Sequence, residues 1–273
     1  MKRRIRRRII AIVVLAFMVI VGIVLVMRLP FLRIQKTEVL GNQLIDREVL
    51  EAHVKDVLDE KYALVIPRSN TFFVPTERIK NELMVSYPRI EEIRIKIRGQ
   101  VLEIQIDERE GKYLWCGGEL ASPLEVQSTC YYADNKGYLF SEAPYFSPGV
   151  YFTFYGGSMD ALLDPIGATF LEPKDFATLL DLRAELDELD LDVAFANAVS
   201  NTMYELYLRP VSDEQTVHTK VIAQFDDDPK TLIKNLKAAL LNPGFQAEYT
   251  DKRTELLYFD LRFPNKVYYK FSE

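Results

Sequence analysis

The stretch IRIKIRGQVLEIQI, residues 93–106, decides the expected fold of the region around it. Its centre, Gly99-Gln100, is a two-residue loop with glycine first, as a type II′ hairpin turn prefers, and such a loop fixes an antiparallel register. One face then carries the apolar pairs Ile97–Leu102, Ile95–Ile104 and Ile93–Ile106, and the other carries Lys96–Glu103 and Arg94–Gln105. A sheet with one apolar face needs a cover.

Two amphipathic helices that precede this hairpin can supply the cover. The first is predicted in LIDREVLEAHVKDVL (44–58), where Asp46 offers an N-cap oxygen and the apolar face consists of Leu50, Val54, Val57 and Leu58. The second, in PTERIKNELMVSYP (75–88), begins at Pro75 and ends before Pro88. A strand in FLRIQKTEVL (31–40) comes before both, so residues 31–109 are expected to form a compact β-α-α-β-β unit.

The N-terminus joins a basic tail to a long apolar segment. Residues 1–29 contain seven basic side chains and no acidic one, so the rest carries −6 − 7 = −13 at pH 7. Ile9 to Met27 is a run of nineteen uncharged residues, which as a helix can cross a bilayer core of about 30 Å. The positive-inside rule then predicts a cytoplasmic tail at 1–8, a transmembrane helix at 9–29, and everything after it outside the plasma (inner) membrane. A cleaved secretory signal would have a shorter apolar core and a small-x-small site.

The region from residue 110 to 273 is expected to be a β-rich domain with a mainly antiparallel sheet and flanking helices, which makes the fold class α+β. Strands are predicted in GKYLWC (111–116), CYYADNKGYLF (130–140), GVYFTFYGG (149–157), LDVAFANAV (191–199), YELYLRP (204–210) and HTKVIAQF (218–225). One helix is predicted at 173–189, with Phe176, Leu179, Leu180, Leu186 and Leu189 facing the core. A second runs from the cap Asp228 to the stop signal Asn242-Pro243-Gly244.

Cys116 and Cys130, the only cysteines, both fall in the predicted outside portion. A close, even pair in a non-reducing compartment predicts a disulfide that closes a short loop. A zinc site needs about four ligands, and the two histidines, His53 and His218, do not stand at ligand spacing.

The chain closes on LYFDLRFPNKVYYKF (257–271), which reads as two strands around Pro264-Asn265. Alternation predicts one inward face made of Leu257, Phe259, Leu261 and Phe263, and an outward face with Tyr258, Asp260 and Arg262. Past the turn, Val267, Tyr269 and Phe271 share a face, with Lys266, Tyr268 and Lys270 opposite. An edge strand with tyrosines and few charges is a hazard unless it is used, and strand addition by a partner would use it. Which of the two strands is the outer one stays open.

Several of these stretches together resemble one bacterial family. The order of a basic tail, a transmembrane helix and a POTRA-like region resembles the FtsQ/DivIB cell-division family. The stretches that resemble the family's POTRA domain are VLGNQLIDREVLEAHV (39–54) and YPRIEEIRIKI (87–97) with LEIQIDERE (102–110). YYADNKGYLF (131–140) resembles that family's D…G hairpin, and FDLRFPNKVYYKF (259–271) resembles its closing iDLR strand. The resemblance covers nearly the whole chain in the family's order, although the loop from Cys116 to Cys130 is not part of the family's general pattern.

The resemblance implies a bitopic scaffold at the division septum, not an enzyme, with a POTRA domain at 30–109 and a C-terminal β domain at 110–273. Members bind small bitopic coiled-coil proteins of the FtsB/FtsL or DivIC/FtsL type through the last strands, and the POTRA domain is credited with recruiting other divisome proteins. No cofactor, metal or catalytic residue is implied. The expected partner-binding residues are Tyr258, Asp260, Leu261, Arg262, Phe263, Asn265, Val267, Tyr268 and Tyr269.

Two alternatives remain. One is a POTRA-bearing adaptor for envelope assembly or export. The other is a sortase-like thiol enzyme built on Thr129-Cys130, which would need a histidine near the thiolate and an arginine for the oxyanion. Asp226–Asp228 precede a predicted helix, whose positive N-terminal end favours carboxylates. Asp187, Asp190 and Asp192 lack calcium-loop spacing. A charge of −13 after the anchor argues against nucleic-acid binding.

Overall fold

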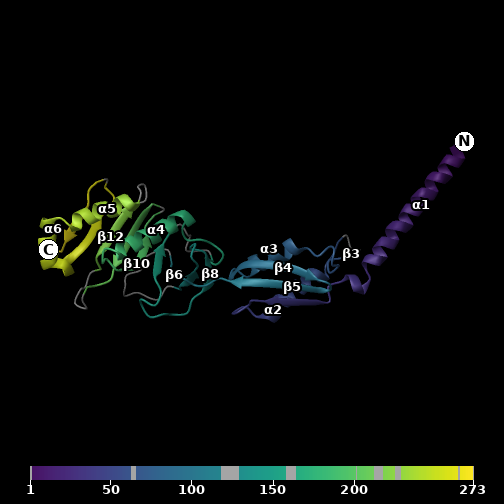
Figure 1. Cartoon of the computed structure of the whole chain (residues 1–273), viewed down its shortest axis with the longest axis horizontal. Coiled ribbons are helices and arrows are strands. Elements are labelled where there is room, and N and C mark those ends of the chain that lie inside the picture. Colours follow the sequence, from purple (N-terminus) through teal and green to yellow (C-terminus); the bar gives the residue numbers. More distant parts are fainter. Residues whose placement is uncertain are drawn as a thin grey trace. The chain divides into compact units, whose positions relative to one another are not determined.

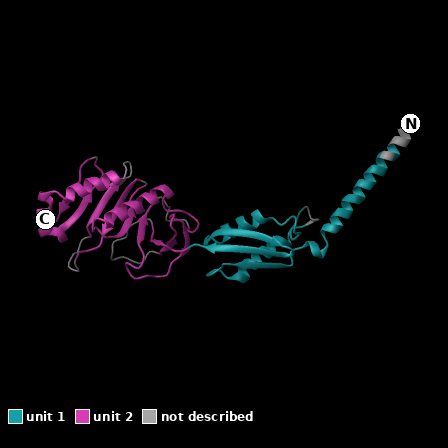
Figure 2. Cartoon of the chain, in the orientation of Figure 1, with its two compact units in different colours: residues 1–109 teal, residues 110–273 magenta. Residues whose placement is uncertain are grey.

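The computed structural model describes residues 2–62, 66–117, 129–157, 164–200, 202–211, 218–224, 229–263 and 265–272. The chain divides into two compact units, residues 1–109 and residues 110–273 (Figure 2). After one apolar N-terminal helix, both units combine helices with sheets, and strands dominate the remainder. The predicted cap Asp228, its acidic neighbours Asp226 and Asp227, and the turn residue Pro264 lie outside the described residues.

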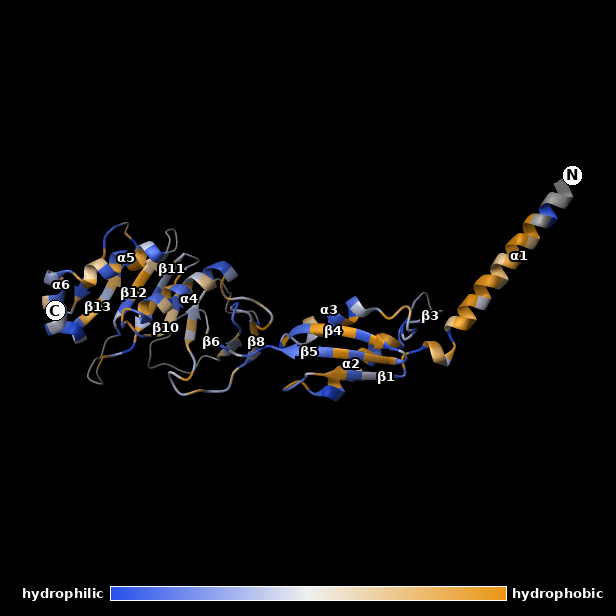
Figure 3. Ribbon diagram, in the orientation of Figure 1, coloured by the Kyte–Doolittle hydropathy of each residue, from blue (hydrophilic) through white to orange (hydrophobic). Residues whose placement is uncertain are grey.

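The first unit begins with α1 (Lys2–Met27) (Figure 1). Its segment Ile9–Met27 has a mean hydropathy of 3.5, no part of it is buried, and Figure 3 shows it as hydrophobic along its length. Among the described residues α1 is the one helix that is long and apolar enough to span a membrane.

A three-stranded sheet follows η1 (Pro30–Leu32), in the order β1 (Lys36–Leu40), β5 (Val101–Glu108), β4 (Ile90–Arg98). β1 runs parallel to β5, and β4 runs antiparallel to it. All five predicted cross-strand pairs of the hairpin are present, from Ile97–Leu102 at the turn to Ile93–Ile106. Gly99 has a φ of 63°, which the turn requires and glycine adopts without strain. The predicted register is confirmed.

Helices α2 (Arg47–Asp59) and α3 (Thr76–Ser86) pack on the apolar face of this sheet. Asp46 caps α2 by accepting a hydrogen bond from the Glu48 amide at 2.9 Å, as predicted. The buried side chains of the two helices and the hairpin form one core of Leu50, Val54, Val57, Leu58, Ile79, Leu83, Ile93, Leu102, Ile104 and Ile106, joined by Val39 and Ile90. A short ladder of β2 (Lys61–Tyr62) and β3 (Ile66–Pro67), which the sequence did not predict, stands between the helices in the chain.

The second unit is built on a nine-stranded mixed sheet. From one edge to the other its strands are β14 (Tyr268–Phe271), β13 (Leu256–Asp260), β12 (Lys220–Gln224), β11 (Met203–Leu208), β10 (Val193–Ala198), β9 (Thr153–Gly156), β6 (Tyr113–Trp115), β7 (Tyr131–Ala133) and β8 (Leu139–Glu142). The pairs β6–β9, β9–β10 and β12–β13 are parallel, and the other neighbours are antiparallel.

One face of this sheet packs against α4 (Pro173–Asp187), α5 (Pro229–Leu240) and α6 (Pro243–Lys252), which leads through η2 (Arg253–Glu255) into β13. The rings of Phe154, Phe170 and Phe176 meet at the centre of this core, with centroids 5.2–5.5 Å apart. On α4 the buried positions include Leu182, which the sequence does not predict, whereas Leu180 lies at the margin of the core, as does Leu189 just after the helix. The helix therefore faces the sheet slightly differently from the prediction.

Asn242-Pro243-Gly244, which the sequence predicts as the stop of one helix, also starts the next helix. α5 ends at Leu240, and Asn242 then caps α6 by accepting hydrogen bonds from the amides of Gly244 (2.9 Å) and Phe245 (3.3 Å). Pro243 occupies the first turn of α6, where its missing amide hydrogen costs nothing. Phe245, 2% exposed, anchors this helix in the core.

The alternation predicted for the terminal hairpin is wrong at both ends of its first strand. The register shifts between Leu256 and Tyr258, which leaves Leu257 as an extra residue opposite β14. Leu256 (2% exposed) takes the core position expected for Leu257, which is half-buried. β13 ends at Asp260, so the period of two does not extend to Phe263, and that ring is 45% exposed. Phe259 and Leu261 are buried as predicted.

Candidate protein-binding surface

The last strand in the chain, β14, forms one edge of the nine-stranded sheet, and β8 forms the other. It pairs antiparallel with β13, and β13 pairs in parallel with β12 on its other side. Both hydrogen-bonding sides of β13 are therefore occupied, whereas no described strand pairs with the outer side of β14. This resolves which of the two terminal strands forms the edge.

The backbone groups on the outer side of β14 can be assigned from the ladder. The Ser272 amide donates to the Glu255 carbonyl oxygen at 2.8 Å, so residue 272 points toward β13. Successive residues of a strand point their backbone groups to opposite sides. Lys270 and Tyr268 therefore point inward, and the amide and carbonyl groups of Tyr269 and Phe271 point outward, where a partner strand would pair.

The side chains of β14 divide between core and surface. Phe271 is half-buried against the core, and the Tyr269 ring packs edge-on against Phe245 with centroids 4.7 Å apart. Tyr268 is 48% exposed, and its ring meets the exposed ring of Phe263 edge-on at 4.9 Å. Tyr268 and Phe263 therefore form an exposed aromatic pair beside the strand edge, and Tyr269, itself 38% exposed, points to the opposite face of the sheet.

The Asp260–Arg262 pair lies in the connection between the two strands. Arg262 donates from Nη2 and Nε to the Asp260 carboxylate at 2.6 and 2.9 Å, and its backbone amide donates to the same carboxylate at 3.1 Å. Burial by itself would raise the pKa of Asp260, but the hydrogen bonds and charge of Arg262 outweigh it, and the pKa is lowered. Arg262 is thus held against the sheet, with Nη1 3.7 Å from the Met203 sulfur, and it orders the connection.

The remaining predicted partner-binding residues differ in their availability. Leu261 is 1% exposed, so its side chain belongs to the core, and Val267 packs against that core. Tyr258 is half-buried in the sheet face opposite the helices. Asn265 is exposed and has a φ of 59°, which places it in the left-handed region within the turn. Among the large apolar side chains of this set, those of Phe263, Tyr268 and Tyr269 are exposed to a partner.

The sheet face opposite the helices also carries a polar cluster that the sequence did not single out. Lys220 and the Tyr207 hydroxyl donate to opposite oxygens of the Glu205 carboxylate, at 2.6 and 2.7 Å. Burial would raise the pKa of Glu205, but these hydrogen bonds outweigh it and lower the pKa. Burial and the bond to Glu205 raise the pKa of Tyr207. Alternation in YELYL and KVIAQ, where these residues stand on the polar face, was the available signal.

A groove of about 650 Å³ opens toward the other end of the same sheet. The Cys116–Cys130 disulfide lines it, together with the rings of Tyr151, Tyr155 and Phe195. Thr129, Arg209 and His218 also line it, so the residue types that a sortase-like site would need gather here. Both of the chain's cysteines are in the disulfide, however, and Arg209 is paired with Asp192 at 2.6 Å.

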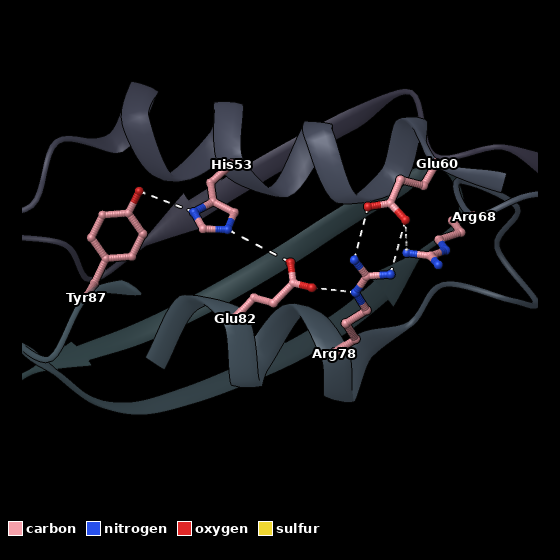
Figure 4. A network of polar contacts seen from close by, with 6 residues as sticks. All are labelled: His53, Glu60, Arg68, Arg78, Glu82 and Tyr87. Atoms are coloured by element: carbon pink, nitrogen blue, oxygen red, sulfur yellow. Dashed lines mark hydrogen bonds and ion pairs between the residues drawn. The ribbon is translucent and has the colours of Figure 1, made fainter. Parts of the chain in front are cut away.

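The first unit contains a second cluster of charged residues, which joins α2 to α3 (Figure 4). Glu60 binds both Arg68 and Arg78, and Arg78 also pairs with Glu82. His53 lies between Glu82, 4.0 Å away, and the Tyr87 hydroxyl, 3.4 Å away. These pairs run from α2 and the Glu60 that follows it to α3, so the network ties the two helices together.

No group of three or more His, Cys, Asp or Glu side chains among the described residues is placed to hold a metal ion. The carboxylate of Asp187 instead accepts from the Val193 amide and pairs with Arg183 at the end of α4.

Comparison of the sequence with models of known protein families and with curated proteins gives no match.

Proposed function

We propose that this chain is a non-enzymatic, single-pass membrane scaffold that binds other single-pass proteins by adding one of their strands to β14. The observation that carries the proposal is the outer side of β14, with which no described strand pairs, whereas β13 and β12 are paired on both sides. Main-chain hydrogen bonds to Tyr269 and Phe271 give affinity, and the rings of Phe263 and Tyr268 give specificity.

Membrane attachment adds to this binding. Six basic residues precede the apolar segment of α1, so we place the tail in the cytoplasm and both units outside the membrane. An anchor confines the scaffold to the plane of the bilayer, which raises its effective concentration for partners that share the plane. Weak strand pairing then suffices to assemble a complex.

The sequence resemblance to the FtsQ/DivIB family supplies the biological setting, which is the bacterial division septum. The three-stranded sheet with two helices on one face is compatible with a POTRA domain at 30–109. The partners proposed are small bitopic coiled-coil proteins of the FtsB/FtsL or DivIC/FtsL type. A second role, recruitment of other divisome proteins, falls to the POTRA domain.

A pair of substitutions at one residue tests the edge. Tyr269→Pro removes both the ring and the outward amide hydrogen, whereas the matched control Tyr269→Ala removes the ring alone. Loss of one backbone hydrogen bond should weaken binding by about 1 kcal/mol, or roughly fivefold, beyond the control. The full-length tagged chain is extracted in mild detergent, and the co-purified single-pass proteins are quantified by mass spectrometry.

Equal recovery of such partners by wild type, Tyr269→Ala and Tyr269→Pro would show that β14 does not pair with them. Phe263→Lys gives an independent test, because its exposed ring contributes little to the core. Fluorescence localisation of the tagged chain separates the division setting from the envelope-assembly alternative, since only a divisome scaffold concentrates at the septum.

The thiol-enzyme alternative has one favourable observation, the groove shared by Cys130, His218 and Arg209. The disulfide opposes it, because a nucleophile needs a free thiolate. Titration of the unfolded, unreduced protein with a thiol reagent decides the matter. Two reactive thiols per chain would revive the enzyme, and none would leave the disulfide as a structural bond.

A further inference from the structure

Three exposed phenylalanines lie where α1 meets the rest of the first unit. Phe31, in η1, is 63% exposed, and Phe72 and Phe73, in the loop after β3, are 75% and 40% exposed. Large apolar side chains at this exposure are usual at a surface when they stand singly, but a group of them indicates an interaction site. Nothing in the proposed scaffold function accounts for this group.

The loop that carries Phe72 is tied to the end of α1. Asn70 is fully buried, and its side-chain amide donates to the Met27 carbonyl oxygen at 2.8 Å. Its side-chain oxygen accepts from the Phe72 amide at 3.0 Å, so one side chain joins the last residue of the apolar segment to the exposed ring's own backbone. In Figure 1, β3 lies beside the end of α1.

Further hydrogen bonds make this junction continuous. The Thr71 amide donates to the Leu32 carbonyl oxygen at 2.8 Å, and the Ile34 amide donates to that of Ser69 at 2.7 Å. The Gln100 side chain donates to the Pro30 carbonyl oxygen at 3.0 Å, which adds the turn of the hairpin. The loop, the hairpin turn and the segment after α1 are therefore held together at one end of the unit.

We propose that this end of the first unit docks onto the outer surface of the lipid bilayer, with Phe31 and Phe72 inserted at the headgroup level and Phe73 beside them. The inference rests on the membrane-spanning role proposed for α1. The patch is continuous with that helix, since Phe31 follows Met27 by four residues and Phe72 is two residues from the Asn70 that contacts Met27.

The chemistry of the bilayer fits this placement. The headgroup region adds roughly 5–8 Å beyond each side of the hydrocarbon core, a thickness that side chains next to the end of a spanning helix reach directly. Phenylalanine, like tryptophan and leucine, is typical of the apolar surfaces that insert at the boundary between headgroups and acyl chains. The exposed Arg28, the first charged residue after the apolar segment, lies at the depth of the lipid phosphates.

A matched pair of tryptophan variants tests the docking. Phe72→Trp places a reporter in the patch, and Leu44→Trp places one at an equally exposed site, 74% against 75%. The Leu44 amide donates to the carboxylate of Glu108, the last residue of β5. Leu44 therefore lies at the end of β5 opposite the hairpin turn that adjoins the patch. The eight residues of β5 separate the two ends of the unit by about 24 Å.

Each variant of the full-length chain is reconstituted into phosphatidylcholine–phosphatidylglycerol vesicles that contain lipids brominated just below the headgroups. We expect Phe72→Trp to emit at shorter wavelength than Leu44→Trp and to lose intensity to the bromines, while Leu44→Trp does not. Trp115, the native tryptophan in the second unit, is 4% exposed. Its emission is a constant background that is measured on the wild-type chain.

Phe17→Trp, in the middle of α1, separates the two hypotheses. If deep-brominated lipids quench Phe17→Trp but shallow ones leave Phe72→Trp unquenched, the anchor holds and the docking inference is wrong. If neither is quenched, the membrane span itself is wrong. A blue-shifted but unquenched Phe72→Trp would mean that protein, such as a second copy of the chain, covers the patch, and this too would overturn the inference. Phe31→Trp repeats the test if Phe72→Trp does not fold.

Discussion

Replacement of Phe259 by alanine tests which side of the terminal hairpin belongs to the core. Phe259 is fully buried on β13, and its ring lies 5.7 Å from that of Phe245 on α6. A buried Phe→Ala change costs about 3–5 kcal/mol. The second unit has 273 − 109 = 164 residues, so its unfolding entropy is about 0.34 kcal/mol/K, and 4 kcal/mol should lower its Tm by about 12 °C.

The matched change on the neighbouring strand is Tyr268→Ala. Tyr268 is 48% exposed and packs chiefly on the exposed Phe263, so its loss should cost at most about 1 kcal/mol and lower Tm by less than about 3 °C. The fluorescence of Trp115 during thermal unfolding of residues 30–273 reports on the second unit alone, because Trp115 is the single tryptophan. A Tyr268→Ala variant as unstable as Phe259→Ala would show that the rings of β14 are core residues and that the proposed binding surface is not one.

Three further changes have defined outcomes. Replacing Cys116 and Cys130 by serine opens a loop that the disulfide closes across a sequence separation of 14. In oxidising buffer the variant should lose about 3 kcal/mol of stability, measured by thermal unfolding. In reductant, as the control, the two proteins should be equally stable. The pKa of Asp260 is lowered in the folded state, so its ion pair with Arg262 stabilises the fold above the unfolded pKa of about 3.9, and this contribution is lost as pH falls through the folded pKa. Urea titrations should show a smaller free energy of unfolding for Asp260→Asn than for wild type at pH 6. The difference between the two proteins should narrow toward pH 3. Asn242→Ala removes the cap of α6 and should cost about 1 kcal/mol by the same titration, whereas Asn242→Asp, which keeps the accepting oxygen, should cost less.

The sequence predicted best those features that depend on neighbours in the chain. The register of the 93–106 hairpin follows from a two-residue turn and the alternation on either side of it, and the structure has every predicted pair. The cap at Asp46 likewise needs only residues one turn away. A turn or a cap is satisfied by local backbone groups, so its signal survives in the sequence.

Where the prediction failed, contacts from distant segments decided the outcome. Leu256 displaced Leu257 from the core because β13 must pair with β12 on one side and β14 on the other, and the extra residue is accommodated as a bulge. Asn242 begins α6 as well as following α5, because burial of Phe245 in the core stabilises the second helix. The cluster of Glu205, Tyr207 and Lys220 forms only when β11 and β12 lie side by side.

The same division holds for the proposed sites. By itself the sequence determined that the chain has an apolar segment long enough to span a membrane, and that it ends in two strands rich in tyrosine. Only the tertiary structure decided that β14 is the edge, and that Asn70 brings Phe72 to the end of α1. Hydrophobic period and turn chemistry act over a few residues, whereas strand order and side-chain clusters arise from packing between segments that the chain separates by tens of residues.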